Sequence, residues 1–344
     1  MKTLTVAAES RKYQIHIGAG AVSMLPEVLT VKHAVIVTDG NIAQMYAARV
    51  MELLNDAGIA STLCVIPAGE QNKTLATVER LYHEFAAAEM NRRGVVIALG
   101  GGITGDIAGF AAATFMRGVQ VVQIPTTIVA QVDSSVGGKT GVNLGEGKNL
   151  VGAFHQPSAV IADTDFLHTL PEREWRAGLA EVVKCYALGE TAIAPLLAPH
   201  PTEENLEQLV ALCCRLKARY VAEDERDTGA RAALNFGHTF AHAIEKYYDY
   251  ARYNHGEAVA IGMRLALEAG EKLGVTPTST VLDVRAAIEQ AGLDTSLELS
   301  PRELVPLMLG DKKNTSANIS LVLLQDLGKP IVYEISPREL EELL

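Results

Sequence analysis

The stretch that decides the fold is residues 95–106, VVIALGGGITGD. Its first five residues are apolar and mostly β-branched, as in a buried parallel strand. Gly100, Gly102 and Gly105 then match the pattern G-x-G-x-x-G, between a predicted strand and a predicted helix. Glycines let the backbone approach a pyrophosphate, and the helix N-terminus supplies N–H groups. The stretch therefore predicts a dinucleotide site, with a tight turn that binds no ligand as the alternative.

The glycine pattern lacks its usual acidic partner. An ordinary Rossmann unit carries an acidic residue roughly 20 residues later, which holds the ribose, but none stands near Val119–Gln120. Asp39, at the end of the apolar run VIVTD, is a better candidate and indicates a variant site. A second segment, VGGKT at 136–140, resembles the end of a P-loop. The upstream glycine of that motif would fall at Asp133, so we exclude an ATPase.

Strand-like and helix-like segments alternate on both sides of this stretch. Further apolar runs occupy 34–38, 62–66, 121–124 and 159–162, and helical periodicity marks 41–57 and 75–89. This alternation predicts a parallel sheet with helices on both faces. Two early runs, 3–7 and 13–17, can add a hairpin at the edge.

After about Pro171 the sequence pattern changes from alternating strands and helices to mainly helical segments. Four segments look helical, at 171–189, 203–224, 232–248 and 256–274, and a late strand pair is expected at 319–324 and 331–335. We expect an α/β fold in which residues 1–170 form a parallel-sheet, dinucleotide-binding domain. Residues 171–344 would form a mostly α-helical domain that binds metal and substrate. The active site is expected in the cleft between the two.

Composition narrows the range of partners. The 344 residues include 30 Lys and Arg against 41 Asp and Glu, a net charge of −11 that disfavours nucleic acid and anionic membranes. No apolar run reaches the roughly 18–20 residues of a membrane span, and no signal-peptide pattern precedes residue 20. We expect a cytoplasmic protein whose cysteines are buried thiols: Cys64, Cys185, Cys213 and Cys214.

Metal-binding residue types gather in the second half. His238 and His242 stand four residues apart in NFGHTFAH, on one helical face, but the segment lacks the glutamate of a zincin protease. His255 begins the segment HGEAV, and Glu181 and Lys184 share a face of GLAEVVK. Three N/O ligands from separate helices, with one position open, are typical of catalytic Zn²⁺. Spacing alone does not separate His238 from His242, and a lone histidine is more often structural.

Cations and one aspartate complete the candidates. An anionic substrate of so acidic a chain requires a local cluster of cations. Lys184 lies in an apolar run, where burying a charge is costly unless it is paired, so a functional role is indicated. Asp133 is as compatible with a helix N-cap as with a role in the site. The cations amid apolar sequence are Arg117, Lys139, Lys148, Lys184, Lys217, Arg231, Lys312 and Lys313.

Together these segments resemble the 3-dehydroquinate synthase family over nearly the whole chain. The matching motifs are GEQNKT (69–74), GGGITGDIAGFAAATFMRG (100–118), IPTTIVAQVDSSVGGKTGVN (124–143), GKNLVGAFHQP (147–157), GLAEVVK (178–184), LNFGHTFAHAIE (234–245) and HGEAVAIGM (255–263). Two departures are Cys185-Tyr186-Ala187, where the family commonly has Tyr-Gly, and TSAN after DKKN.

The resemblance implies a lyase of the shikimate pathway, which leads to the aromatic amino acids. Such an enzyme converts 3-deoxy-D-arabino-heptulosonate 7-phosphate to 3-dehydroquinate and phosphate. The steps are transient oxidation by NAD⁺, β-elimination of phosphate, reduction, ring opening and aldol closure. The resemblance further implies one bound NAD⁺, one divalent metal (Zn²⁺ or Co²⁺) and a homodimer.

The resemblance also distributes the site residues. It assigns Glu181, His238 and His255 to the metal and moves His242 to the substrate phosphate. Catalytic positions are Asp133, Lys139, Lys184, Asn235 and His242. Substrate-binding positions are Arg117 (from the neighbouring subunit), Lys148, Asn149, Lys217, Arg231 and Lys312, with Lys313 left open as the alternative to Lys312. NAD contacts are Asp39, Asn41, Gly69, Glu70, Lys73, Gly102, Ile103, Thr104, Gly105, Asp106, Thr126, Thr127, Lys139, Lys148, Phe166, Leu167, His168 and Thr169.

Three rival functions stay open from the sequence. A sister sugar-phosphate cyclase would make 2-deoxy-scyllo-inosose or a valiolone-type product, although Asn235 and His242 favour the dehydroquinate branch. A metal-dependent polyol dehydrogenase would release NADH at each turnover. An NAD-binding sensor would leave the metal ligands and the cations unexplained.

Overall fold

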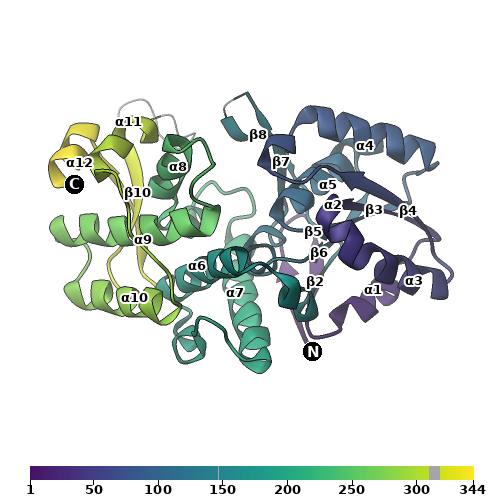
Figure 1. Ribbon diagram of the computed structural model, residues 1–344, viewed down its shortest axis with the longest axis horizontal. Coiled ribbons are helices and arrows are strands. Elements are labelled where there is room, and N and C mark those ends of the chain that lie inside the picture. Colours follow the sequence, from purple (N-terminus) through teal and green to yellow (C-terminus); the bar gives the residue numbers. More distant parts are fainter. Residues whose placement is uncertain (146, 310–317) are drawn as a thin grey trace. The chain divides into compact units, whose positions relative to one another are not determined.

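The computed structural model describes residues 1–145, 147–309 and 318–344, and it divides into two compact units (Figure 1). The first unit comprises Met1–Leu170 together with Lys217–Arg226. The second comprises Pro171–Leu216 and Asp227–Leu344. A division at residue 170 alone would have left 217–226 in the second unit, but the C-terminal end of helix α7 (Glu203–Glu223) belongs to the first.

The first unit is built on a seven-stranded sheet of order β1-β2-β9-β6-β5-β3-β4. Its edge strand β1 pairs antiparallel with β2, and the other neighbours are parallel. The predicted parallel strands and the edge hairpin are therefore confirmed. The strands are β1 (Lys2–Ala7), β2 (Lys12–Gly18), β3 (His33–Asp39), β4 (Ala60–Ile66), β5 (Val95–Gly100), β6 (Gln120–Pro125) and β9 (Ala159–Asp163).

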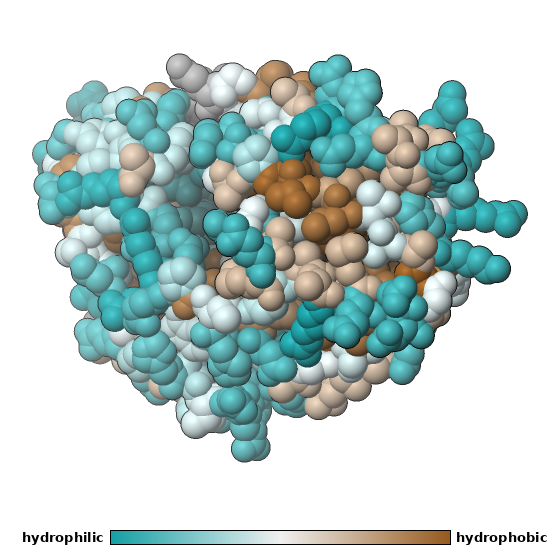
Figure 2. All heavy atoms as spheres, turned by 45° about the vertical axis from the view of Figure 1, so that its right-hand side comes forward, coloured by the Kyte–Doolittle hydropathy of each residue, from teal (hydrophilic) through white to brown (hydrophobic). Residues whose placement is uncertain are grey.

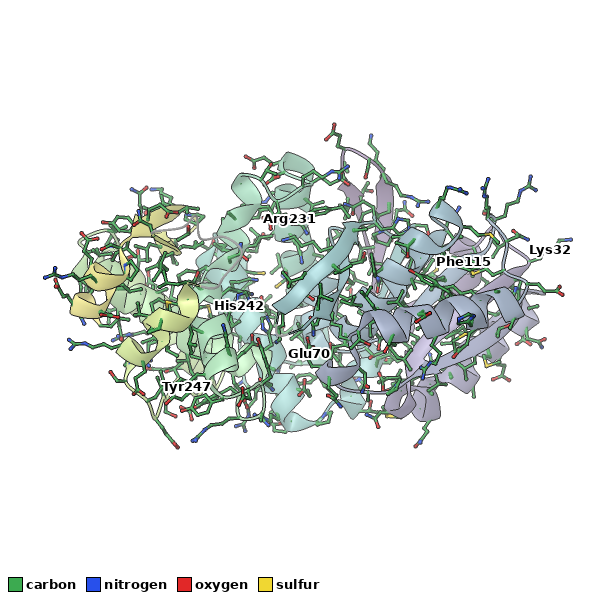
Figure 3. All side chains as sticks on the ribbon, turned by 90° about the horizontal axis from the view of Figure 1, so that it is seen from above. Lys32, Glu70, Phe115, Arg231, His242 and Tyr247 are labelled. Atoms are coloured by element: carbon green, nitrogen blue, oxygen red, sulfur yellow. The ribbon has the colours of Figure 1, made fainter. Side chains whose placement is uncertain are left out.

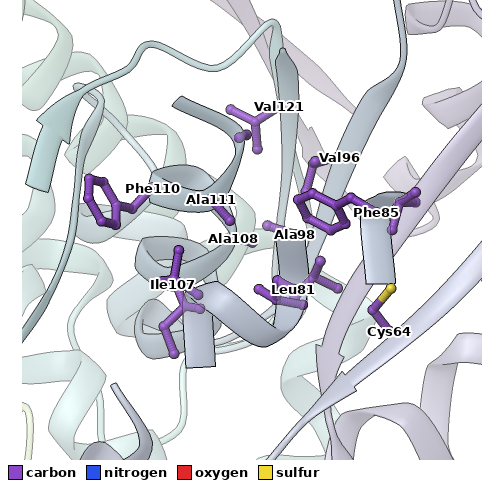
Figure 4. Packing of buried hydrophobic residues seen from close by; sticks show 14 of the residues in the cluster. Cys64, Leu81, Phe85, Val96, Ala98, Ile107, Ala108, Phe110, Ala111 and Val121 are labelled. Atoms are coloured by element: carbon purple, nitrogen blue, oxygen red, sulfur yellow. The ribbon is translucent and has the colours of Figure 1, made fainter. Parts of the chain in front are cut away.

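Helices cover both faces of this sheet, as the alternation predicts. On β5, Val96 and Ala98 pack in a cluster with α4 and α5 (Figure 4), whereas Ile97 and Leu99 pack in a second cluster with α1 and α3. Because both faces of the strand are buried, its sequence is continuously apolar. The helices of this unit are α1 (Leu25–Val28), α2 (Gly40–Ile42), α3 (Ala48–Asp56), α4 (Leu75–Ala87) and α5 (Gly102–Thr114).

The strand order reverses between β3 and β5. From β3 the chain first adds β4 on one side and then continues through β5, β6 and β9 on the other. In open α/β sheets, ligands bind outside the carboxyl ends of the strands at such a reversal. Asp39 ends β3 and the glycine-rich turn follows β5, so both lie at this point.

One hairpin of the first unit was not predicted. Strands β7 (Lys139–Leu144) and β8 (Gly147–Phe154) pair antiparallel outside the main sheet. Their glycines hide the strand pattern but allow close pairing, since a Cβ on Gly152 would lie 2.2 Å from the carbonyl oxygen of Thr140. The hairpin carries three predicted site residues, Lys139, Lys148 and Asn149.

The second unit is mostly helical, as expected, with one antiparallel strand pair. Its elements are α6 (Glu172–Ala187), the start of α7, α8 (His238–Tyr247), α9 (His255–Lys272), α10 (Thr278–Gln290), α11 (Val305–Met308), α12 (Pro337–Leu343), β10 (Ile319–Leu324) and β11 (Pro330–Ile335). The single helix predicted for 232–248 is wrong. A 3-10 turn spans Ala230–Asn235, and Gly237, at φ 79°, breaks the chain before α8 begins.

Helix α9 approaches α6 and the start of α8 very closely. A Cβ on Gly256 would lie 2.0 Å from the carbonyl oxygen of Ala177 in α6. A Cβ on Gly262 would lie 2.1 Å from the carbonyl oxygen of Gly237, just before α8. Only glycine fits at such distances, so these two positions determine how near the helices with the candidate metal ligands can come.

Two further expectations concern the whole chain. The four cysteines are free thiols and buried, as predicted. Among the helices of the described residues, none combines the length and the apolar character needed to cross a membrane.

Candidate metal centre and nucleotide site

Glu181, His238 and His255 meet in the second unit, although they come from α6, α8 and α9. One ligand atom from each lies within 4.8 Å of the others. Glu181 Oε1 is 3.4 Å from His255 Nε2 and 3.6 Å from His238 Nε2. Ligand atoms about 2.0–2.1 Å from a tetrahedral Zn²⁺ stand about 3.4 Å apart. The donor set and its spacing therefore fit a divalent metal ion.

Neighbouring groups orient these side chains. Lys184 Nζ lies 2.5 Å from Glu181 Oε2, and both side chains are buried, so Oε1 is the oxygen that faces the histidines. His238 Nδ1 is 3.1 Å from the carbonyl oxygen of Phe236, and His255 Nδ1 is 3.3 Å from Glu245 Oε1. If each Nδ1 donates to its oxygen, each Nε2 keeps a lone pair for a metal.

The two histidines differ in their affinity for a proton. Burial and the Lys184 ammonium lower the pKa of His238 well below its ordinary value, against the opposing effect of Glu181. Burial also lowers the pKa of His255, but hydrogen bonds to Glu181 and Glu245 outweigh it and raise the pKa to about 10. A ligand histidine must be neutral. A metal would thus compete with a proton more strongly at His255 than at His238.

The second unit also holds three of the other predicted residues. Arg231 lies in the 3-10 turn before α8 and is 1% exposed, and His242 is half-buried on α8 (Figure 3). The His242 ring stands edge-on to that of His238, with centroids 5.8 Å apart. Asn235 donates from Nδ2 to the carbonyl oxygen of Ala232. These residues share a short segment of chain with the metal-binding candidate His238.

Asp133 belongs to the first unit, and its contact corrects one interpretation. It lies inside the π-helical turn Ala130–Ser134, so the N-cap alternative is wrong. Lys217, near the C-terminal end of α7, donates to Asp133 Oδ1 at 2.7 Å and to its carbonyl oxygen at 2.5 Å. The structure thus pairs two predicted site residues that are far apart in the sequence.

A second network joins predicted cofactor and substrate residues. Lys73 is 4% exposed, and its Nζ lies 2.5 Å from Asp106 Oδ2 and 2.6 Å from Asn149 Oδ1. Burial raises the pKa of Asp106, and the Lys73 ammonium opposes that rise. Asn143 donates to Glu70 Oε1 and accepts from the Asn149 amide, each at 2.8 Å. Asn143 was not among the predicted site residues, although it ends the motif at 124–143.

The predicted NAD contacts other than Lys139 and Lys148 follow the carboxyl ends of parallel strands. Five strands of the first unit lead into these segments: β3 into Asp39 and Asn41, β4 into the 69–74 loop, β5 into Gly102–Asp106, β6 into Thr126 and Thr127, and β9 into Phe166–Thr169. Strands of a parallel sheet end at one edge, so these segments share it. Phe166 and Leu167 are buried there, whereas His168 and Thr169 are exposed.

Local details of this edge fit a dinucleotide. Helix α5 begins at Gly102 without a side-chain cap, which leaves its first N–H groups for an anion. The buried Thr126 hydroxyl has no hydrogen-bond partner among the described residues. Asp39 caps α2 through Oδ1, and its Oδ2 accepts from Thr104 at 3.4 Å. This edge of the sheet thus offers backbone donors at the turn, the Thr126 hydroxyl and the Asp39 carboxylate.

The remaining candidates are more scattered. Arg117 is exposed and left-handed at φ 69°, Lys139 is exposed at the start of β7, and Lys148 is half-buried on β8. They lie in the first unit. Lys312 and Lys313 lie outside the described residues.

Comparison with known proteins identifies relatives over the full length. The family described as 3-dehydroquinate synthase matches in two parts, N-terminal at residues 63–177 and C-terminal at 178–314. The 3-dehydroquinate synthase of Halorhodospira halophila is 45% identical over 354 residues, which cover 100% of this chain and 99% of the relative.

Solved structures of other synthases share the fold. 2-Deoxy-scyllo-inosose synthase, in complex with carbaglucose-6-phosphate, NAD⁺ and Co²⁺, has a TM-score of 0.91 at 26% identity and covers 99% of both chains. 2-Epi-5-epi-valiolone synthase from Streptomyces hygroscopicus, with NAD⁺ and Zn²⁺ bound, has a TM-score of 0.87 at 26% identity, over 98% of this chain and 97% of its own. Both identities are far below the 45% shared with the dehydroquinate enzyme. The chain belongs to the 3-dehydroquinate synthase family.

Proposed function

We propose that the chain works as a 3-dehydroquinate synthase with NAD⁺ at the carboxyl ends of the parallel strands and a divalent metal on Glu181, His238 and His255. Its reaction is that of the family: it converts 3-deoxy-D-arabino-heptulosonate 7-phosphate to 3-dehydroquinate and phosphate. The observation that carries the metal assignment is the separation of 3.4 and 3.6 Å between the Glu181 oxygen and the two histidine nitrogens.

The related synthases support these cofactors, since one was solved with NAD⁺ and Co²⁺ and another with NAD⁺ and Zn²⁺. When bound, NAD⁺ takes up and returns a hydride, and Zn²⁺ or Co²⁺ polarises the hydroxyl group that is oxidised. The protein must hold both groups in fixed positions. Lys184 contributes by holding one oxygen of Glu181, which leaves the other for the metal.

The cationic side chains supply positive charge for the two anionic groups of the substrate. In this proposal Lys217 and Arg231 bind the substrate carboxylate, while Lys148, Asn149 and His242 bind its phosphate. Guanidinium and ammonium groups form strong charge-assisted hydrogen bonds with both anions. Asp133 takes up a proton from a substrate hydroxyl, and its contact with Lys217 orients the carboxylate. Lys139, Asn235 and Lys312 complete the substrate site.

The proposal includes a homodimer in the cytoplasm, in which Arg117 reaches the site of the neighbouring subunit. Arg117 is exposed, and both it and Met116 have positive φ, which suits a loop that presents a side chain outward. One face of the molecule gathers apolar side chains among hydrophilic ones (Figure 2). The first unit exposes Met116, Leu144, Leu150 and Phe154. Apolar exposure of this kind supports a protein partner.

The test is a direct assay of stoichiometry. The protein is incubated with the heptulosonate phosphate, a catalytic amount of NAD⁺ and Zn²⁺, and phosphate and 3-dehydroquinate are measured together. We expect one of each per substrate consumed, without net NADH. Accumulation of NADH with no phosphate release would replace the synthase by a dehydrogenase, and phosphate release with another cyclic product would indicate a sister cyclase.

A further inference from the structure

We propose that Glu245, which the assignments above leave without a role, is a positioning residue that sets the tautomer and orientation of His255. Through His255, Glu245 increases the affinity of the centre for its divalent metal ion. This inference rests on the proposed function, because it concerns the metal site formed by Glu181, His238 and His255.

The geometry of His255 carries the inference. Its Nδ1 lies 3.3 Å from Glu245 Oε1, and its Nε2 lies 3.4 Å from Glu181 Oε1. The imidazole therefore stands between two carboxylates, one at each nitrogen. Glu181 belongs to the candidate ligand set and Glu245 does not. Glu245 thus contacts the nitrogen that faces away from the metal position.

The chemistry of imidazole explains what this contact does. A neutral imidazole has one N–H donor and one acceptor nitrogen, and a carboxylate can only accept. If Nδ1 donates to Glu245, the lone pair must reside on Nε2, beside Glu181. A carboxylate at this place also makes the ligand nitrogen more basic. Between the two neutral tautomers of His255, Glu245 therefore favours the one that can bind a metal through Nε2.

His238 has an independent arrangement of the same kind. Its Nδ1 lies 3.1 Å from the carbonyl oxygen of Phe236, and its Nε2 faces Glu181 Oε1. Both histidines of the centre thus have an acceptor at Nδ1, although the two acceptors come from different parts of the chain. An acceptor at Nδ1 of both histidines indicates that the site requires each Nε2 to face the metal position.

The burial of Glu245 also needs an explanation. It is 3% exposed on α8, at the spacing i, i+4, i+7 from His238 and His242 on the same helical stripe. A buried carboxylate is costly unless it is paired. An apolar residue would fill this place at lower cost if packing were the sole requirement.

The experiment measures metal affinity rather than turnover. Zn²⁺ and Co²⁺ are titrated into the metal-free, full-length protein in competition with a chromophoric chelator, for wild type, Glu245→Gln and Glu245→Ala. We expect Kd to rise about 10- to 100-fold in Glu245→Ala, the usual effect of losing such a partner. Glu245→Gln keeps an acceptor without the charge and should lie between the two.

Glu268→Gln is the matched control. Glu268 lies on α9 with His255 but pairs with Arg264 and Arg285, so its loss should leave the metal affinity unchanged. If Glu245→Gln and Glu245→Ala, with intact circular dichroism, bind metal as tightly as wild type, the inference is overturned. Should Glu245→Ala fail to fold, the isosteric Glu245→Gln decides. Failure of the wild type to bind one metal per chain would instead overturn the proposed function.

Discussion

The metal centre of the second unit and the glycine-rich turn of the first are built on opposite principles. The turn is local: its strand, glycines and helix lie within residues 95–114, and what it presents is backbone. The metal centre brings ionisable side chains together from three helices; Glu181 and His238 are buried and His255 is half-buried. A substitution at the turn should therefore act through steric fit, whereas a substitution at the metal centre should act through electrostatic interactions.

The difference extends to what holds each region together. The turn is held by ordinary packing of a parallel sheet between helices. The centre contains a buried ion pair, Glu181 with Lys184, whose partners are each costly to bury alone. We therefore expect the centre to be sensitive to single charge deletions and the turn to be sensitive to single methyl additions.

The largest expected effect is that of His238→Ala, which tests whether the centre works as one unit. Metal and activity should be lost together, and kcat/KM should fall by about three orders of magnitude, since a catalytic metal supplies several kcal/mol. Metal content by atomic absorption and the phosphate-release assay measure the two. His242→Ala, whose ring lies beside His238, should keep the metal and weaken substrate binding. Metal loss in His242→Ala alone would reverse the two assignments.

Lys184→Met tests whether charge dominates the centre. It leaves the buried Glu181 carboxylate without its ammonium, which should lower the free energy of unfolding by about 3–5 kcal/mol in the metal-free protein. Added Zn²⁺ should recover part of that loss, because the metal replaces the missing positive charge. Urea unfolding with and without Zn²⁺ measures both. Equal losses in the two conditions would mean that the lysine acts by packing alone.

Gly102→Ala tests whether shape dominates the turn. The added Cβ would lie 2.9 Å from Ser134 Oγ, at the N-terminus of α5. NAD⁺ affinity should fall about 10- to 200-fold, the effect of one misplaced methyl group in a pocket, while metal affinity stays unchanged. Isothermal titration measures both. If adding Ser134→Ala restores NAD⁺ binding in full, the clash is with serine and not with the cofactor.

The smallest effect is expected at Glu225, which belongs to neither region. It accepts hydrogen bonds from Ser10 and Gln156; burial raises its pKa, but these bonds outweigh burial and hold the pKa below its ordinary value. Its stabilisation is therefore present above the unfolded pKa of about 4.3 and is lost as pH falls through the folded pKa. Glu225→Gln should remove about 1 kcal/mol at pH 7 and less at pH 3. A larger loss at pH 3 would contradict the sign.

Much of the first unit could be predicted because its signals are local. Each buried strand carries its own apolar run, and the run at 95–99 is followed directly by its glycine turn. The hairpin β7–β8 escaped prediction because glycines interrupt both of its strands, which lie outside the main sheet. The break before α8 was missed for a related reason, since Gly237 takes a left-handed conformation that a sequence permits but does not require.

The sequence by itself determined the residue types of the site and, through its motifs, the family. Tertiary structure alone decided which atoms meet. It turned one oxygen of Glu181 toward two histidines and the other toward Lys184, placed Glu245 behind His255, and paired Asp133 with Lys217. The physical reason is the separation along the sequence of the residues that interact. Strand and helix signals come from neighbours along the chain. The contacts of the site depend instead on how closely the folded helices pack, and Gly256 and Gly262 permit the close packing.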